Sequence, residues 1–312
     1  MSIAVSIVIV NWNTGDMLRE CCQSIVSSDM TGIVLKEVIV VDNASTDGSA
    51  QGLAHIGLPL HLVANDGNRG FGVACNQGAA LATGEFILFL NPDVRLYKRT
   101  LARTLDFMSS TSSADIGICG VRLEDQRGKY TTSFASFPSV WTILKLAVGL
   151  SSLQIAELPS GVAQSDTVVE VDQVIGAYFL VRSGVFHELE GFDERFFVYF
   201  EEVDFSWRAR LAGWRSVCLA DVGAFHFGGG SSQQVKSLRL FYSLRSRLQY
   251  AAKHFSVAGF ICVMFVTLFL ELVSRSVLAF VRGSKKQVIE TWVAYGLLLR
   301  WILQWFLRGT GL

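Results

Sequence analysis

The chain has 312 residues, of which 51% are hydrophobic and 17% are charged. That length suits one large α/β domain, alone or with an appendage. The charged fraction is below the ~25% usual in soluble domains and the mean hydropathy is positive, so a membrane or a large buried surface is expected. Residues 236–312 carry 11 basic and 2 acidic residues, whereas residues 1–235 carry 16 basic and 25 acidic residues. The basic, apolar tail is expected to meet an anionic surface.

The six cysteines form no CxxC pair, and most of them lie in apolar runs. We interpret them as reduced thiols in a cytosolic compartment, with neither a zinc site nor a disulfide framework. The first apolar run, Ile3–Val10, follows no basic segment and stops at Asn11 without a small-residue cleavage site. We interpret it as a buried strand rather than a signal peptide.

The first 90 residues alternate between strand and helix patterns. Continuous β-branched runs predict strands that are covered on both faces, and Ser45 and Thr46 are suited to cap a helix. The other predicted elements are strand Ile3–Val10, helix Gly15–Ser28, strand Val38–Val41, strand Leu60–Val63, helix Phe71–Ala82 and strand Phe86–Leu90. This alternation indicates an α/β fold with a mostly parallel central sheet and flanking helices.

The second half of the chain is less regular. A further strand is expected from Asp115 to the turn that ends at Gly128, and residues 134–166, with two of the four prolines, are expected to form an insertion or acceptor loop. Later elements are strand Val174–Val181, helix Glu201–Leu211 and strand Ser216–Leu219. Because the composition changes after Gln234, we divide the chain into a domain of residues 1–233 and an apolar helical tail of residues 234–312.

Polar residues follow three of the predicted strands. In open parallel sheets, ligands bind beyond the carboxyl ends of the strands. A turn explains any one of these positions, but three at one edge predict a polar cleft. They are Asn11 and Asn13, Asp42, and Asn91 and Asp93. Asn91 and Asp93 are two residues apart, so in an extended segment their side chains are expected to face one ligand. Mg²⁺ is usually held by one or two carboxylates together with substrate phosphates, so this segment is a candidate metal site.

Glycine and asparagine residues crowd between the third predicted strand and the helix after it. They include Asn68, Gly70 and Asn76. Glycine lets a backbone approach a ligand closely, and a helix N-terminus favours a diphosphate; a mobile loop with helix caps is the alternative. The spacing gives no dinucleotide fingerprint after the first strand, which disfavours a Rossmann oxidoreductase.

An acidic cluster ends an aromatic run in the stretch GFDERFFVYFEEVD. On the predicted helix Glu201 and Asp204 share a face, whereas Glu202 points elsewhere. Apolar neighbours raise a carboxylate pKa and suit it to act as a base; the alternative is acidic residues placed favourably at a helix start. His226, in HFGGGSS, follows another strand, and near a polar cleft it is a candidate metal ligand.

In its motifs the sequence resembles the family 2 glycosyltransferases with the GT-A fold, and within them the bacterial rhamnosyltransferase-like group. The motifs appear in the family's order over roughly residues 3–232. They are VSIVIVNWN, VVDNASTDGS, NDGNRGFGVACNQG, the FLNPD version of the DxD motif, GFDERFFVYFEEVDFSWR and HFGGGSS.

The resemblance implies a donor pocket at the polar edge. Asp42 would contact the nucleotide base, and Asn11, Asn13 and Asn91 would belong to the same donor site. Asn68, Gly70 and Asn76 would help line it.

The resemblance also implies roles for the acidic residues and the histidine. Asp93, with Asn91, would hold Mg²⁺ or Mn²⁺ on the diphosphate, and His226 would be a further metal or diphosphate contact. Glu202 stands where many members have the aspartate that acts as general base. Because that position is a glutamate here, Glu201 and Asp204 stay candidates for the base.

The expected function is therefore a metal-dependent, inverting transfer of a sugar, with rhamnose from dTDP-rhamnose as the first choice. The acceptor would be a hydroxyl of a saccharide or lipid-linked saccharide in cell-envelope polysaccharide synthesis, and nucleic acid is not an expected partner. A sugar-1-phosphate nucleotidyltransferase is one alternative, but the basic, glycine-rich loop that it needs after the first strand is missing. A noncatalytic, membrane-bound sugar-binding protein is another.

Two apolar stretches in the tail, Phe255–Leu270 and Thr291–Leu307, suggest a location at the cytoplasmic face of the bacterial inner membrane. As a helix, the first would span about 24 Å, short of a ~30 Å hydrocarbon core. Extension to Val281 brings in Glu271 and Arg275, which are costly at the bilayer centre. We therefore expect helices lying in the interface rather than two full spans. A soluble helical subdomain or a dimer interface is the alternative.

Overall fold

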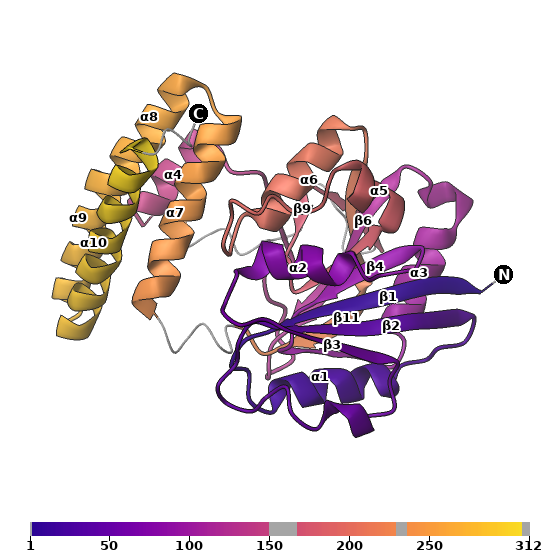
Figure 1. The fold of residues 1–312 in the computed structure, drawn as a ribbon. Coiled ribbons are helices and arrows are strands. Elements are labelled where there is room, and N and C mark those ends of the chain that lie inside the picture. Colours follow the sequence, from indigo (N-terminus) through magenta and orange to yellow (C-terminus); the bar gives the residue numbers. More distant parts are fainter. Residues whose placement is uncertain (1, 150–166, 229–235, 308–312) are drawn as a thin grey trace. The chain divides into compact units, whose positions relative to one another are not determined.

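The structure, a computed structural model, describes residues 2–149, 167–228 and 236–307. The described residues form two compact units, coloured along the chain in Figure 1. The α/β unit comprises residues 2–137, 167–194 and 201–228, and the helical unit comprises residues 138–149, 195–200 and 236–307. A single cut at residue 233 therefore does not separate the two units, because two segments from the middle of the chain pack within the helical unit.

A nine-stranded sheet forms the centre of the α/β unit, in the order β3-β2-β1-β4-β10-β6-β11-β5, with β8 also paired to β11. The strands are β1 (Ile3–Asn11), β2 (Ile33–Asp42), β3 (Leu60–Ala64), β4 (Phe86–Leu90), β5 (Val94–Leu96), β6 (Ile116–Glu124), β8 (Val168–Val171), β10 (Tyr178–Arg182) and β11 (Arg215–His226). Strands β3, β2, β1 and β4 are parallel neighbours, and β11 is parallel to β6. Strand β10 runs antiparallel between β4 and β6. The α/β fold with a central sheet is confirmed, but the sheet is mixed rather than mostly parallel, because β5 and β8 also pair antiparallel with β11.

Helices cover both faces of this sheet (Figure 1). Helices α1 (Met17–Val26) and α3 (Thr100–Ser109) pack on one face, and α2 (Phe71–Ala79), α5 (Ser183–Glu188) and α6 (Glu201–Leu211) pack on the other. Successive side chains of a strand point to opposite faces, so Ile7 and Ile9 of β1 join the first core and Val8 joins the second. The continuous apolar run of β1 is thus explained by burial on both faces.

The structure corrects two of the predicted elements. No α-helix begins at Ser45 and Thr46, because the Ser45 hydroxyl and the Asp47 carboxylate accept hydrogen bonds from the N–H groups of Asn13 and Gly15 in the loop after β1. Within the predicted loop of residues 134–166, β7 (Phe134–Ala135) pairs with β9 (Gln173–Val174), and α4 (Val140–Ala147) is a helix capped by Ser139. Residues 150–166 of that loop lie outside the described residues.

The helical unit is built mainly from the tail. Its remaining helices are α7 (Lys236–His254), α8 (Val257–Phe265), a π-helical segment (Val266–Glu271), α9 (Leu272–Val281) and α10 (Lys285–Leu307). One core joins α4, α7, α8 and α10, with Ile143, Leu248, Val263 and Leu298 among its buried members. The tail is therefore helical, as predicted, and has an apolar core of its own.

A buried ion cluster lies in this core. Glu271, 1% exposed, accepts hydrogen bonds from Arg247 of α7 and from Arg275 of α9. Burial alone would raise the pKa of Glu271, but the two guanidinium groups outweigh it, and the net pKa lies below the usual value for glutamate. Glu271 is thus turned into the protein interior.

An apolar stripe runs along the outside of the helix formed by α8, the π-helical segment and α9. Its members recur at every fourth residue and are 54–75% exposed: Val257, Ile261, Phe265, Phe269, Val273, Val277 and Val281. On an α-helix such a repeat drifts by about 40° per step, because a turn takes 3.6 residues. The π-helical segment winds less per residue and offsets this drift. By length and composition, the helix Val257–Val281 is the one helix of the described residues that is apolar enough to cross a membrane.

Candidate active site

The carboxyl ends of β1, β2 and β4 meet at one edge of the sheet, as the sequence predicted. Asn11 is paired with Asp42 in the parallel register of β1 and β2, and its Nδ2 donates to Asp42 Oδ1 at 2.8 Å. Val8 of β1 is paired with Phe89 of β4, which places the Asn91–Asp93 segment at the same edge. This edge is where ligands of open α/β sheets bind.

Asn11 uses its side chain within the protein. It is fully buried, its Nδ2 also donates to the hydroxyl groups of Ser45 and Ser49, and its Oδ1 accepts a hydrogen bond from Thr14 at 2.5 Å. These contacts fasten the loop after β2 to the end of β1. Asn11 therefore fixes the loop after β2 through Asp42, Ser45 and Ser49. The sequence indicated Ser45 as a helix cap and gave no signal for Ser49.

Asn13 occupies the next turn, in the left-handed region with φ of +51°. Asparagine tolerates this conformation better than most residues. Its Oδ1 accepts a hydrogen bond from the Thr46 backbone N–H at 2.8 Å, and its own N–H donates to Ser45 Oγ at 3.0 Å. The two loops at the ends of β1 and β2 are thereby held as one surface.

The glycine-rich segment leads into α2 at this edge. Asn68 Oδ1 accepts a hydrogen bond from the Gly70 N–H at 3.0 Å, and Gly70 has φ of +94°, which favours glycine. The Gly70 carbonyl accepts a hydrogen bond from Asn43 Nδ2, at the end of β2. No side chain caps α2, so the first N–H groups of the helix are suited to an anion.

Asn76 lies on α2 and ties it to the segment before α6. Its Nδ2 donates to the Phe192 carbonyl at 2.8 Å and its Oδ1 accepts from the Phe192 N–H at 2.9 Å. Gly191 is required beside it, because a Cβ there would lie 2.7 Å from Asn76 Oδ1. The structure thus uses Asn76 to hold α2 next to the acidic cluster.

The Asn91–Asp93 segment is a turn, which corrects the extended conformation expected from the sequence. The Asn91 carbonyl accepts a hydrogen bond from the Val94 N–H at 3.1 Å, with Pro92 between them, where its fixed φ suits a turn. The alternation of side chains along an extended strand therefore does not place Asn91 and Asp93 on the same side. Asp93 instead meets His226: their Oδ1 and Nε2 atoms are 3.5 Å apart, because Val94 of β5 pairs with His226 of β11.

Two adjacent glutamates begin α6, and the hydrogen bonding of both carboxylates is incomplete. Glu201 Oε2 and Glu202 Oε2 are buried and have no hydrogen-bond partner among the described residues. Burial raises the pKa of Glu201, and the neighbouring Glu202 charge raises it further. Burial also raises the pKa of Glu202, although backbone hydrogen bonds from Val203 and Gly176 partly oppose this. Both carboxylates are poised to hold a proton.

Asp204 has a different environment from the two glutamates. It is fully buried and bound to Arg208 at 2.8 Å, one helical turn along α6. Arg208 also donates to the carbonyl groups of Leu189 and Gly191. Asp204 therefore holds the segment before the helix. The i, i+4 spacing of Asp204 and Arg208 is visible in the sequence and signals this pair.

A short chain of contacts links Glu202 to the sheet edge. A Cβ on Gly176 would lie 3.8 Å from the Glu202 carboxylate. The next residue, Ala177, accepts a hydrogen bond from the Asn91 N–H at 3.0 Å. Because β10 is antiparallel to β4, its start lies beside the end of β4, and Glu202 approaches the same edge as Asp93. No sequence signal marked Gly176.

The donor set at Asp93 fits a divalent metal of the Mg²⁺ or Mn²⁺ type. A carboxylate and an imidazole 3.5 Å apart leave most coordination positions to phosphate oxygens and water. Within the described residues, no group of three or more His, Cys, Asp and Glu side chains is arranged to hold a metal. Such a sparse site suits a metal that arrives with a diphosphate.

The sheet order and this polar edge are those of an α/β protein of the GT-A type. Residues 6–156 match the family model "Glycosyl transferase family 2". Over these residues the chain is similar to this family, and its motifs resemble those of the rhamnosyltransferase-like group.

Two curated relatives support this assignment. The chain is 29% identical over 173 residues to "Rhamnosyltransferase WbbL" of Escherichia coli (strain K12), covering 55% of this chain and 63% of the relative. It is 27% identical over 217 residues to "N-acetylglucosaminyl-diphospho-decaprenol L-rhamnosyltransferase" of Mycobacterium tuberculosis (strain CDC 1551 / Oshkosh), covering 61% of this chain and 66% of the relative. In both cases the match spans less than two thirds of the relative.

Among solved structures, the fold is similar to that of the mannosyltransferase PcManGT from Pyrobaculum calidifontis, solved with GDP-Man and Mn²⁺. The TM-score is 0.57 at 16% identity, covering 96% of this chain and 88% of the other. At this identity the likeness concerns the fold, and it confirms the GT-A architecture expected from the sequence.

Proposed function

We propose that the protein is a metal-dependent, inverting glycosyltransferase that moves a sugar from a nucleotide diphosphate to an acceptor hydroxyl. The observation that carries this proposal is a pair of buried, partly uncompensated carboxylates, Glu201 and Glu202, beside the sheet edge that holds Asp93 and His226. Rhamnose from dTDP-rhamnose is the first donor to test, because two relatives are named as rhamnosyltransferases.

Glu202 is the general base of this proposal. It contacts the Gly176 region at the sheet edge, and its raised pKa lets it take a proton from a hydroxyl near neutral pH. As the acceptor oxygen attacks the anomeric carbon, its proton passes to the Glu202 carboxylate and the nucleotide diphosphate leaves. One displacement of this kind inverts the anomeric configuration.

Glu201 and Asp204 act on Glu202 from two sides. The Glu201 charge and the shared burial favour one proton on the pair, and Asp204 fixes the helix that carries both through Arg208. Asp42, the last residue of β2, would meet the nucleotide base. Asn68 and Gly70 shape the N-terminus of α2, which would face the diphosphate.

Asp93 and His226 would hold the metal, together with diphosphate oxygens. When bound, a divalent cation supplies positive charge that stabilises the departing diphosphate. PcManGT, which shares the fold, was solved with Mn²⁺.

We place the protein at the cytoplasmic face of a bacterial inner membrane, held by its helical unit. The apolar stripe offers a surface for the acyl region, and the basic residues of 236–312 suit anionic headgroups. The buried Glu271 cluster faces the helical core rather than lipid, so its charge does not oppose membrane contact. A lipid-linked saccharide acceptor suits this location, and one relative is named for a substrate on a decaprenol diphosphate.

The test is a screen of nucleotide sugars for thermal stabilisation with and without Mn²⁺, followed by transfer assays with the sugar that stabilises most. A bound donor raises the melting temperature. We expect Asp93→Ala to keep its fold and lose the metal-dependent part of donor binding, measured by calorimetry. A variant that retains the full gain from Mn²⁺ would contradict the metal assignment.

Transfer assays also separate the two alternatives. Release of pyrophosphate from a nucleoside triphosphate and a sugar phosphate would identify a nucleotidyltransferase. Donor binding with neither transfer nor hydrolysis would indicate a noncatalytic sugar-binding protein.

A further inference from the structure

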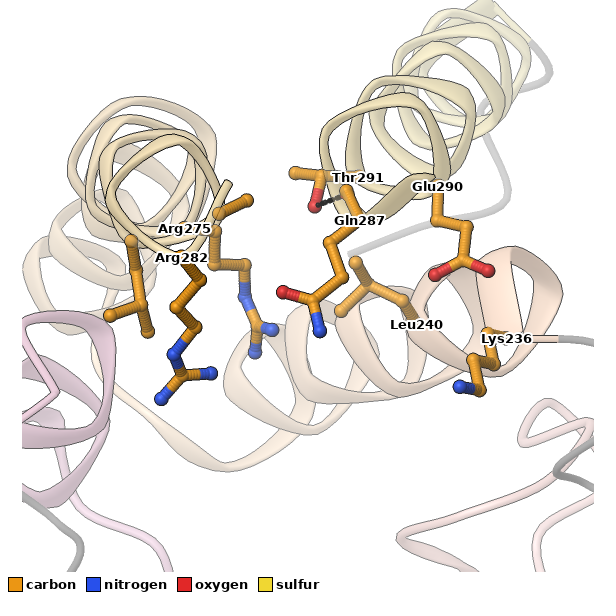
Figure 2. A pocket seen from close by; sticks show the side chains of 9 residues that line it. Lys236, Leu240, Arg275, Arg282, Gln287, Glu290 and Thr291 are labelled. Atoms are coloured by element: carbon orange, nitrogen blue, oxygen red, sulfur yellow. Dashed lines mark hydrogen bonds between the residues drawn. The ribbon is translucent and has the colours of Figure 1, made fainter. Parts of the chain in front are cut away.

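A recess in the helical unit gathers cations from separate helices. It has a volume of about 270 Å³ and lies among α7, α9 and α10. Figure 2 shows the guanidinium groups of Arg275 and Arg282 reaching from the α9 side toward Gln287 of α10, with Lys236 of α7 at the other end. Glu290 is the acidic residue of its lining.

The charge of the recess is not balanced by the protein. Glu271 neutralises one of the two arginines that hold it, so the buried cluster keeps one positive charge. Arg282 and Lys236 add two more, and among the described residues neither forms an ion pair. Glu290 removes one, which leaves a net charge of about +2 for an anion to neutralise.

Arg275 is preorganised for such an anion. Its Nε donates to Glu271 Oε1 at 2.8 Å and its Nη2 lies 2.7 Å from the same oxygen, while the side chain stays 39% exposed. The guanidinium fork is therefore held from the protein side, with its outer edge toward the recess. Favourable charge at a helix end accounts for Arg282, the residue after the end of α9, but not for Lys236 and Arg275.

The surroundings point to a lipid rather than a free anion. Leu240, Leu278 and Ala279 line the recess beside the cations. Leu278 is 47% exposed, and Val281, the last member of the apolar stripe, precedes Arg282. A hydrocarbon chain on the stripe would leave its headgroup at the recess, whose volume suits a headgroup but not a whole lipid.

We propose that this recess binds the anionic phosphate headgroup of a lipid whose chain lies along the apolar stripe. This inference rests on the proposed membrane location. The phosphate belongs either to a bilayer phospholipid or to the diphosphate of a lipid-linked saccharide, and the two sources are separable by experiment.

Flotation of the full chain with vesicles tests the site. The vesicles contain phosphatidylcholine alone, phosphatidylcholine with phosphatidylglycerol, or phosphatidylcholine with a polyprenyl diphosphate. Arg282→Gln is compared with Arg300→Gln, which removes the same charge from an exposed position of α10 outside the recess. Lys236→Gln tests the site from α7.

We expect Arg282→Gln and Lys236→Gln to weaken binding to one phosphate lipid by roughly tenfold or more. Arg300→Gln should cost about fivefold or less, the effect of one basic residue near an anionic surface. A selective loss with phosphatidylglycerol identifies a phospholipid, and a selective loss with polyprenyl diphosphate identifies the acceptor lipid. Equal losses in the three variants would overturn the site alone. A wild-type chain that binds no vesicle would overturn the membrane location as well, whereas sugar transfer to a soluble acceptor would be untouched.

Discussion

The glutamates with buried carboxylate oxygens in the two units differ in their hydrogen-bond and ion-pair partners. In the α/β unit, Glu201 and Glu202 are adjacent, each has an oxygen without a hydrogen-bond partner among the described residues, and burial raises the pKa of both. In the helical unit, Glu271 is 1% exposed and held by Arg247 and Arg275, and its net pKa is lowered. In the proposed mechanism, the same side chain thus serves proton transfer in one unit and packing in the other.

The difference lies in the partners rather than in the burial. An uncompensated buried carboxylate costs stability unless it is neutralised, and a fold keeps it where the proton is used. A carboxylate between two guanidinium groups cannot readily accept a proton, so Glu271 is suited to join helices. This comparison predicts opposite outcomes for substitutions in the two units.

The largest effect on stability is expected from Arg247→Met. Removing one partner of a buried ion pair typically costs about 3–5 kcal/mol, and Arg247 is 3% exposed beside Glu271. The free energy of unfolding, measured by urea titration followed with circular dichroism, should fall by about that amount. Arg300→Gln serves as the exposed control. A loss below about 1 kcal/mol, as for an exposed ion pair, would contradict the structural role.

The largest effect on activity is expected from Glu202→Gln. Losing a general base costs roughly 10²-fold or more in rate, so initial rates of sugar transfer should fall by that factor while calorimetry shows unchanged donor binding. Asp204→Asn should instead lower thermal stability, because it weakens the contact with Arg208. Near-normal turnover in Glu202→Gln with abolished turnover in Glu201→Gln or Asp204→Asn would show that another carboxylate is the base.

A smaller effect is expected from Glu201→Gln. Since the folded pKa of Glu201 is raised, the folded state binds the proton more tightly than the unfolded state, and stability is lost as pH rises above the ordinary glutamate pKa. The uncharged amide removes that loss. The melting temperature should rise by a few degrees at neutral pH, at about 2–4 °C per kcal/mol, with no gain below the ordinary glutamate pKa. A lower melting temperature at neutral pH would contradict the charge repulsion.

The sequence predicted the sheet and its polar edge because apolar runs such as Ile3–Val10 and Phe86–Leu90 leave few alternatives to buried parallel strands. It predicted the acidic cluster because carboxylates beside aromatic residues are unusual. It did not predict the turn at Pro92, the meeting of Asp93 with His226, or the approach of Gly176 to Glu202. Those contacts depend on β10 and β11 pairing across the sheet, and one sequence carries no register for such distant strands.

In the tail, too, the sequence predicted the helices but not the contacts between them. Its composition predicted helices and a basic surface, but Glu271 and Arg275 looked like obstacles to membrane contact. In the structure Glu271 turns inward, where Arg275 and also Arg247, 24 residues earlier on another helix, form ion pairs with it. Such a partner is found only when the helices are packed together.

The pH dependence of kcat/KM for sugar transfer tests the central claim most directly. Glu202 must be ionised to accept the acceptor proton, so the rate should fall as pH falls through its folded pKa, which burial has raised. Cys75 of α2, whose own thiol pKa is raised by burial and by Glu201 and Glu202, stays protonated and does not contribute to this limb. We predict an acid limb above the ordinary glutamate pKa of about 4.3 that disappears in Glu202→Gln. A rate that is flat down to that pH, or an acid limb that persists in Glu202→Gln, would contradict the assignment of Glu202 as the base.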